Sequence, residues 1–184
     1  MNKTLAVAAA AAPMALAADT AADMTRVIRT GTLHVAAAPE DAFPLLTAPG
    51  ERLWVPGWDP VIIGGGSGLE RGSAWLTGEG DEHTIWLVVD YDAEKLHARY
   101  ARITPASRAG TVEVAAQPDG SGGTRVDVTY DLTALSKHGN ETLAEFDEAY
   151  YAKMMVEWER LIEAADLDYP VRICLLYTSP SPRD

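Results

Sequence analysis

Polar and apolar residues alternate most regularly between residues 124 and 133, in the stretch TRVDVTYDLT. Val126, Val128, Tyr130 and Leu132 take every second position, and charged or hydroxyl-bearing side chains stand between them. This two-residue period predicts a β-strand with one buried face and one solvated face. Strands of that kind are typical of antiparallel sheets, in which one side packs against a core and the other meets water.

Six further segments are rich in the Thr, Val, Ile and aromatic residues that favour strands. Turns rich in glycine or proline separate several of them, and PDGSGG, which joins the last two strands, is a strong hairpin signal. The strand candidates lie at 25–35, at two short segments within 61–78, and at 83–91, 95–103, 111–117 and 124–133.

Two other segments favour helices. Residues 38–46, APEDAFPLL, place a proline at a first-turn position with two acidic residues behind it, which suits a helix N-terminus. Pro44 and Pro49 keep that helix short. From 140 to 167, apolar residues recur at steps of three and four, which predicts one long amphipathic helix. Its apolar stripe consists of Leu143, Phe146, Tyr150, Met154, Trp158, Leu161 and Ala165.

The order of these elements is one strand, short helices, about six more strands and a long helix. Segregated elements of this kind predict an α+β fold, in which the long helix lies across one face of a curved antiparallel sheet of about six to seven strands. Residues 24–168 have the length of one domain with a single core.

Composition and charge exclude several kinds of chemistry. The net charge of −12 argues against nucleic acid as a partner, because phosphate binding needs clustered Lys and Arg. Cys174 is the only cysteine, so the domain has neither a disulfide nor a thiol catalyst. The four histidines lack the spacing of a zinc site, and we expect no metal and no other cofactor. His97 alternates away from Ala98 and Tyr100, which predicts a position on the outer face of the sheet.

Both ends of the chain differ in composition from the domain. Residues 1–18 combine a basic start, an apolar stretch and an Ala-Leu-Ala site, the pattern of a signal peptide, so a periplasmic or secreted protein is expected. The alternative is translation from Met24, which would give a cytoplasmic protein. The apolar stretch is too short and too rich in alanine for a stable membrane span. Residues 174–184, CLLYTSPSPRD, match the conceptual translation of a transposon-type sequencing adapter, which predicts a non-native tail.

Three stretches carry a resemblance to a known superfamily. They are HVAAAPEDAFPLLTAPGERLWVPGWDP at 34–60, HTIWLVVDYD at 83–92 and TRVDVTYDLTALSKHGNETLAEF at 124–146. With the order of the elements, they make the chain similar to the START-related helix-grip superfamily, also called SRPBCC, and within it to the bacterial polyketide cyclase/dehydrase-like proteins. The resemblance implies a curved sheet that grips the C-terminal helix, with a ligand cavity between the two.

The resemblance places the segment ERLWVPGWDP, residues 51–60, beside the opening of that cavity. Its two tryptophans either help to close the cavity mouth or plug the core. On the last helix, Tyr150 and Met154 are expected to line the cavity, because a polar-tipped ring and an adaptable Met suit a flexible apolar ligand. Trp158 is expected to contribute mainly to the core. The candidate ligand-binding residues are Trp54, Trp58, Trp86, Tyr100, Tyr130, Tyr150, Met154 and Trp158.

Three classes of function remain open. A binder or carrier of a small hydrophobic molecule, such as a lipid, an isoprenoid or a polyketide-like compound, needs only the cavity. A cyclase or dehydratase also needs inward acid–base groups, for which Tyr100, Tyr130, Tyr150 and His83 are the candidates, and no catalytic residue is assigned. An interaction module that presents the acidic helix to a protein partner has support only from charge. We favour the binder, because the sequence assembles no convergent cluster of titratable residues.

Overall fold

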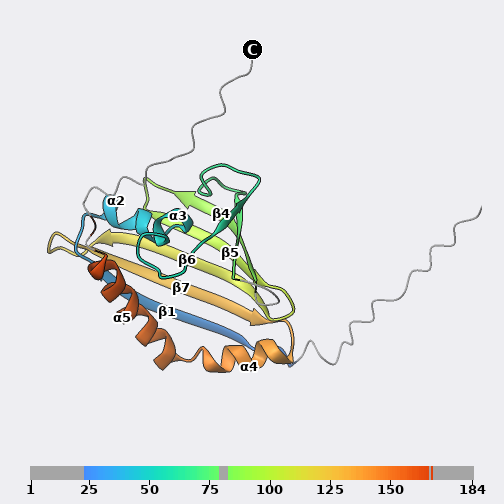
Figure 1. Ribbon diagram of the computed structural model, residues 1–184. Coiled ribbons are helices and arrows are strands. Elements are labelled where there is room, and N and C mark those ends of the chain that lie inside the picture. Colours follow the sequence, from blue (N-terminus) through green and yellow to red (C-terminus); the bar gives the residue numbers. More distant parts are fainter. Residues whose placement is uncertain (1–22, 79–82, 166, 168–184) are drawn as a thin grey trace, which may run out of the picture.

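The computed structural model describes residues 23–78, 83–165 and 167 of the 184-residue chain. Its centre is a seven-stranded antiparallel sheet with the strand order β1-β7-β6-β5-β4-β3-β2, so the first strand pairs with the last (Figure 1). The strands are β1 (Arg26–Val35), β2 (Val61–Ile63), β3 (Ala74–Thr77), β4 (Thr84–Asp92), β5 (His97–Thr104), β6 (Arg108–Pro118) and β7 (Thr124–Ala134).

All the predicted strands are present, with small differences at their ends. β5 begins at His97 rather than at residue 95, because residues 93–96 form a turn in which Asp92 accepts hydrogen bonds from two backbone amides. β6 is longer at both ends than the predicted 111–117. In β7 the apolar positions are the more deeply buried ones, as the two-residue period predicts.

The predicted helix after β1 is present as three short pieces. They are α2 (Pro39–Ala42), the 3-10 helix η1 (Phe43–Leu46) and α3 (Ala48–Glu51). Pro44 and Pro49 each stand in the first turn of a piece, where a backbone N–H has no helical partner to lose. Thr47 caps α3, because its hydroxyl oxygen accepts a hydrogen bond from the amide of Gly50. The apolar side chains of the pieces are buried in the core.

The single helix predicted for residues 140–167 is wrong, because the structure contains two helices there. They are α4 (Lys137–Glu145) and α5 (Glu148–Ala164). Between them, Phe146 leaves the helical conformation with a ψ of 55°. Asp147 is exposed and caps α5, accepting a 2.7 Å hydrogen bond from the amide of Tyr150. An Asp side chain that bonds to nearby amides in this way favours a new helix start over continuation of the previous helix.

The fully buried residues of α5 each follow a predicted stripe position by one residue. Tyr151, Met155 and Ile162 are buried on α5, whereas Tyr150, a member of the predicted stripe, is 56% exposed. Other predicted members on α5 and just beyond it are half-buried against the core: Met154, Trp158, Leu161 and Ala165.

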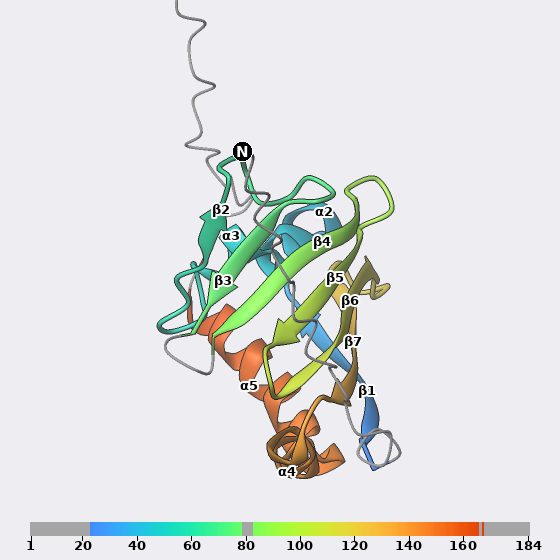
Figure 2. The ribbon, with the colours of Figure 1, turned by 90° about the vertical axis from the view of Figure 1, so that its right-hand side faces the viewer.

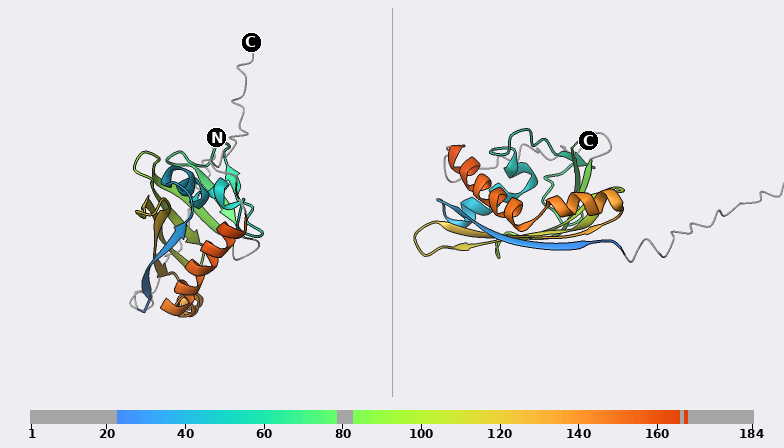
Figure 3. Two further views of the ribbon diagram at one scale, coloured as in Figure 1. Left: turned by 90° about the vertical axis from the view of Figure 1, so that its left-hand side faces the viewer. Right: turned by 90° about the horizontal axis from the view of Figure 1, so that it is seen from below.

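Helix α5 lies on the concave face of the sheet and crosses it at the edge strand β1 (Figures 1, 2 and 3). The crossing point is Gly31, where an added Cβ would lie only 2.7 Å from Cγ of Met155 and 2.8 Å from Cε1 of Tyr151. Gly31 pairs with Val128 of β7, and the Tyr151 hydroxyl donates a 2.7 Å hydrogen bond to the Val128 carbonyl. The missing side chain therefore lets the helix approach the sheet and reach across β1.

Some predictions concern residues beyond this description. The predicted signal peptide, residues 1–18, and the predicted tail, residues 174–184, lie outside the described residues. Among the helices that are described, none is long and apolar enough to cross a lipid bilayer.

Replacing Gly31 by alanine is expected to lower the free energy of unfolding by about 1–3 kcal/mol, the usual cost of overpacking a core. The added methyl group would overlap Met155 and Tyr151, so α5 would have to move away from β1. Chemical denaturation measures the difference. Val156→Ala is the control, because Val156 lies on α5, is 65% exposed and should change stability by no more than about 0.5 kcal/mol when it is truncated. If wild type and Gly31→Ala are equally stable, this contact does not fix the position of α5 against β1.

Candidate functional site: a cavity between the sheet and helix α5

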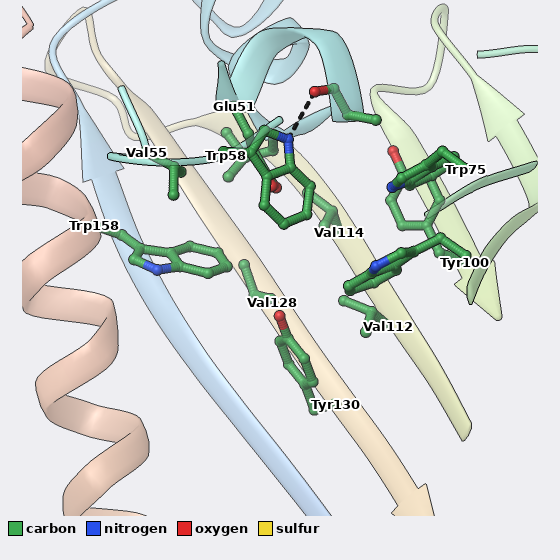
Figure 4. Close-up of a pocket in the computed structure, with 13 residues that line it drawn as sticks. Glu51, Val55, Trp58, Trp75, Tyr100, Val112, Val114, Val128, Tyr130 and Trp158 are labelled. Carbon is green, nitrogen blue, oxygen red and sulfur yellow. Dashed lines mark hydrogen bonds between the residues drawn. The ribbon is translucent and has the colours of Figure 1, made fainter. Parts of the chain in front are cut away.

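A cavity of about 110 Å³, here called the inner chamber, lies between the concave face of the sheet, helix α5 and the segment 46–58 (Figure 4). Most of the side chains around it are apolar or aromatic. They come from the short helices and the turn after them, from β3 to β7 and from α5. The lining residues are Leu46, Ala48, Glu51, Val55, Trp58, Trp75, Trp86, Tyr100, Val112, Val114, Val128, Tyr130 and Trp158.

A second space of about 360 Å³, here called the outer pocket, adjoins the inner chamber and shares Trp58, Trp86 and Tyr130 with it. Its volume falls in the range of roughly 300–1,000 Å³ that is typical of small-molecule sites. The inner chamber alone is small, so it suits one end of a ligand whose body occupies the outer pocket. The other residues of the outer pocket are Thr77, Arg102, Arg108, Leu132, Thr142, Leu143, Glu145, Phe146, Tyr150 and Met154.

The floor of the inner chamber is formed by rows of paired residues that run across the sheet. Tyr100 of β5, Val112 of β6 and Tyr130 of β7 stand opposite one another in register. The neighbouring row on the same face contains the smaller Val114 and Val128. Residues two apart on a strand share a face, so the alternation visible in the sequence positions all five side chains. The short valines leave space above the sheet that larger residues would fill.

The tryptophan segment forms the roof, and its two rings have different surroundings. Trp54 is buried, donates its indole N–H to the Leu45 carbonyl at 2.7 Å and packs edge-on against Trp158. Trp58 is half-buried, donates to the Ala48 carbonyl at 2.9 Å and lines both the inner chamber and the outer pocket. Trp54 therefore connects the roof to α5, while Trp58 lies at the boundary between the two parts of the cavity.

A cluster of aromatic rings forms the wall on the side of β3 to β5. Trp75 stacks on Trp86 with ring centres 5.9 Å apart, and Tyr100 meets Trp75 edge-on at 5.4 Å. Trp58 approaches Trp86 edge-on at 6.2 Å, which extends the cluster into the roof. Stacked and edge-to-face contacts of this kind stabilise large rings beyond the effect of burial alone. Trp75 is not among the predicted site residues, because only the pairing of β3 with β4 places it opposite Trp86.

Glu51 supplies a carboxyl group to the inner chamber. Burial raises the pKa of that group from its ordinary value near 4.5 to about 8. Within the described part of the chain, the carboxyl group has no hydrogen-bond partner. Sequence reasoning missed Glu51, although a signal exists: Ala48, Glu51, Val55 and Trp58 follow one another at steps of three and four and all line the chamber.

Two further polar atoms beside the inner chamber are buried without a hydrogen-bond partner, the hydroxyl of Tyr100 and the indole nitrogen of Trp75. The pKa of Tyr100 is raised mainly by burial and further by the negative charge of Glu51, and both residues line the inner chamber. Burial also raises the pKa of Tyr130, against the opposing positive charge of Arg102. Buried polar atoms without partners are uncommon in folded proteins, so an entering polar group would find hydrogen-bonding capacity here.

The predicted ligand-binding residues gather around the cavity with one exception. Trp54 is not among the described lining residues of either space, because its ring lies in the core behind the roof. Trp158, expected mainly in the core, also lines the inner chamber, while Tyr150 and Met154 line the outer pocket. The remaining candidates that line the inner chamber are Trp58, Trp86, Tyr100 and Tyr130.

The histidines contribute nothing to the two sets of lining residues. His97 lies on the outer face of the sheet, as its alternation predicts, with one ring nitrogen 3.1 Å from Glu113 and the other 3.5 Å from Asp90. His83, a candidate acid or base, is not among the described residues around either space. In the part of the chain that the structure describes, no group of three or more His, Cys, Asp or Glu residues is placed to hold a metal ion.

Comparison with known sequences identifies a family. A protein-family model described as "Polyketide cyclase / dehydrase and lipid transport" matches residues 24–163, which span the sheet and nearly all of α5. No curated protein sequence matches the chain.

Several solved structures share the fold. Norcoclaurine synthase from Thalictrum flavum is similar with a TM-score of 0.57 and 14% identity, over 88% of this chain and 99% of that one. Ara h 8.0201 gives 0.52 and 12%, over 77% and 99%. The protein TTHA0849 from Thermus thermophilus gives 0.51 and 17%, over 77% and 100%. At identities this low, the similarity shows only that the fold is shared. The shared fold confirms the helix-grip arrangement of sheet and C-terminal helix.

The raised pKa of the Glu51 carboxyl group should make the domain less stable as the pH rises from about 4.5 to about 8. In this window the folded protein keeps a proton on Glu51 that the unfolded chain releases, so a higher pH favours unfolding. The total loss is of the order of a few kcal/mol. Denaturation of wild type and Glu51→Gln across this window measures the effect, and the variant should lose this component of the pH dependence.

Three hydrogen-bonded aspartates do not obscure this measurement. Hydrogen bonds lower the pKa of Asp92, Asp119 and Asp131, so their contributions to stability are lost only as the pH falls below the window. Glu141→Gln, at an exposed position of α4, is the matched control and should keep the wild-type pH dependence. Parallel pH profiles for wild type and Glu51→Gln would show that the Glu51 carboxyl is solvated like an ordinary one.

Trp54→Ala and Trp58→Ala should have different effects. Trp54 is buried and hydrogen-bonded, so its removal should cost about 3–5 kcal/mol of stability. Trp58 is only half-buried, so its removal should cost about half as much or less, and it should speed the release of an apolar fluorescent probe. Denaturation midpoints and stopped-flow dissociation rates check both effects. If Trp58→Ala releases the probe at the wild-type rate, or if both variants lose the same amount of stability, the Trp58 ring only fills the core.

Proposed function

The chain belongs to the polyketide cyclase/dehydrase and lipid transport family, and from this premise we propose that it binds a small hydrophobic molecule in the cavity between its sheet and α5. The ligand class is a lipid, an isoprenoid or a polyketide-like compound. Such a protein would carry or sequester its ligand without changing it.

The observation that supports this proposal most directly is an apolar cavity that the fold leaves unfilled. Val112, Val114 and Val128 are too short to reach the roof, and α5 is held at the β1 edge. Protein cores are normally close-packed, and an empty apolar cavity costs stability because its lining atoms lose contacts. An apolar ligand restores those contacts and gains about 25 cal/mol for each Å² of apolar surface removed from water.

The shape of the cavity favours an elongated ligand. The inner chamber and the outer pocket lie side by side, because both are lined by the rings of Trp58, Trp86 and Tyr130. A ligand that occupies both spaces would lie along these ring faces and edges. Met154, at the outer pocket, gives that part of the wall an adaptable side chain.

A second function, cyclase or dehydratase action on an aromatic or polyketide substrate, is favoured by Glu51. A carboxyl group whose pKa lies near neutrality can donate and accept a proton at ordinary pH, and enzymes obtain such groups by burying them. We rank binding first, because no hydrogen bond within the described residues orients this carboxyl group as a catalytic base.

Native mass spectrometry of the protein purified from cells separates the two functions. A retained apolar molecule that leaves the protein unchanged supports the carrier. Release of a cyclised or dehydrated product from an aromatic polyketide-like substrate supports the enzyme.

Val114→Phe should block the cavity and lower the affinity for an apolar fluorescent probe by about tenfold or more, because the ring would project into the inner chamber. Val156→Phe is the matched control: Val156 lies on α5, is 65% exposed and is not among the described residues around the inner chamber or the outer pocket. Fluorescence titration measures both affinities, and circular dichroism checks folding. Unchanged affinity in folded Val114→Phe would place the probe outside the inner chamber.

A further inference from the structure

Three polar residues stand in the mostly apolar wall of the inner chamber and are here called the polar end: Glu51, Trp75 and Tyr100. They are not among the described residues around the outer pocket, and the rings of Trp75 and Tyr100 contact each other edge-on (Figure 4). The Tyr100 hydroxyl and the Trp75 indole nitrogen are buried without partners, and the Glu51 carboxyl has none among the described residues. A purely apolar chamber would be more stable with Leu or Phe at these positions, because unpaired buried polar groups are costly.

We propose that the polar end binds a hydroxyl group carried by an otherwise apolar ligand. This inference rests on the proposed function, since it assumes that the cavity holds a small hydrophobic molecule. It adds the chemical class of that molecule: an uncharged alcohol or phenol whose hydroxyl end enters the inner chamber first, while its apolar body contacts the aromatic wall and the outer pocket.

The three groups match a hydroxyl because they offer both kinds of hydrogen-bond partner. The Trp75 indole can only donate, so it requires an oxygen acceptor on the ligand. The Tyr100 hydroxyl and a protonated Glu51 can each donate or accept. A ligand hydroxyl also donates and accepts, whereas a hydrocarbon leaves all three groups unpaired. A site that binds a hydroxyl through buried polar groups rejects the analogue that lacks it.

A carboxylate ligand fits the polar end poorly. The described residues around the inner chamber include no Lys, Arg or His, so an anion would be buried there without a cation. Arg102 belongs to the outer pocket, where its charge acts on Tyr130. Burial keeps Glu51 protonated at neutral pH, and a raised pKa keeps Tyr100 protonated as well. The polar end is therefore uncharged, which favours an uncharged partner.

The test compares three probes of similar size: 2-naphthol, naphthalene and 2-naphthoate. Binding to the full chain is followed by tryptophan fluorescence and calorimetry at about pH 6.5, where Glu51 and 2-naphthol are both uncharged. Wild type should bind 2-naphthol about tenfold or more tightly than naphthalene, and 2-naphthoate most weakly.

Tyr100→Phe and Glu51→Leu remove the polar atoms and keep the apolar bulk of the side chain. Each variant should lower the affinity for 2-naphthol to near that for naphthalene, while the affinity for naphthalene stays the same or improves. Neither change removes a side-chain hydrogen bond of the described structure, so both variants should fold, and denaturation curves check this. Glu141→Gln removes a carboxyl group at an exposed position away from the cavity lining and should keep the wild-type preference.

The outcomes distinguish this inference from the proposed function. If wild type binds naphthalene and 2-naphthol with equal affinity, the proposal of an apolar ligand cavity is supported and the proposal of a hydroxyl site is wrong. If folded Tyr100→Phe and Glu51→Leu both keep the preference, the hydroxyl is bound elsewhere and the polar end is not the site. If none of the three probes binds wild type, the proposed function fails, and this inference fails with it.

Discussion

The contact between α5 and β1 at Gly31 determines where the other parts of the protein can lie. Met155 and Tyr151 occupy the space that a side chain at Gly31 would take, and Tyr151 reaches across β1 to a backbone carbonyl of β7. A helix held this closely at one edge of a curved sheet leaves the middle strands uncovered. The short helices after β1 form a roof over them (Figure 1). The inner chamber lies between this roof and the sheet.

The roof is connected to both sides of the cavity by aromatic contacts. Trp54 packs against Trp158 of α5, and Trp58 packs against Trp86 of β4. Both indole nitrogens donate to backbone carbonyls of the short helices, so the rings stay in place without filling the inner chamber. The size of the cavity therefore depends on the position of α5 on one side and on the β3–β5 wall on the other.

Polar groups inside this apolar cavity reduce stability, which favours a functional reason for their presence. The Glu51 carboxyl and the Tyr100 hydroxyl both line the inner chamber and have no hydrogen-bond partners in the described structure. Proteins commonly tolerate destabilised groups at sites where a ligand or substrate provides the missing interactions. The two proposed functions, a carrier that recognises a hydroxyl group and an enzyme that moves a proton, would therefore use the same site.

The sequence by itself determined the α+β class, the strands and most of the aromatic cavity lining, because periods of two and of three to four residues record which face of each element is buried. Only the tertiary structure decided three other features. The cap at Asp147 split the last helix, the pairing of β3 with β4 brought Trp75 into the wall, and the roof placed Glu51 at the inner chamber. Periodicity describes neighbours within one element, whereas the pKa of a carboxyl group depends on atoms that come together from distant parts of the chain.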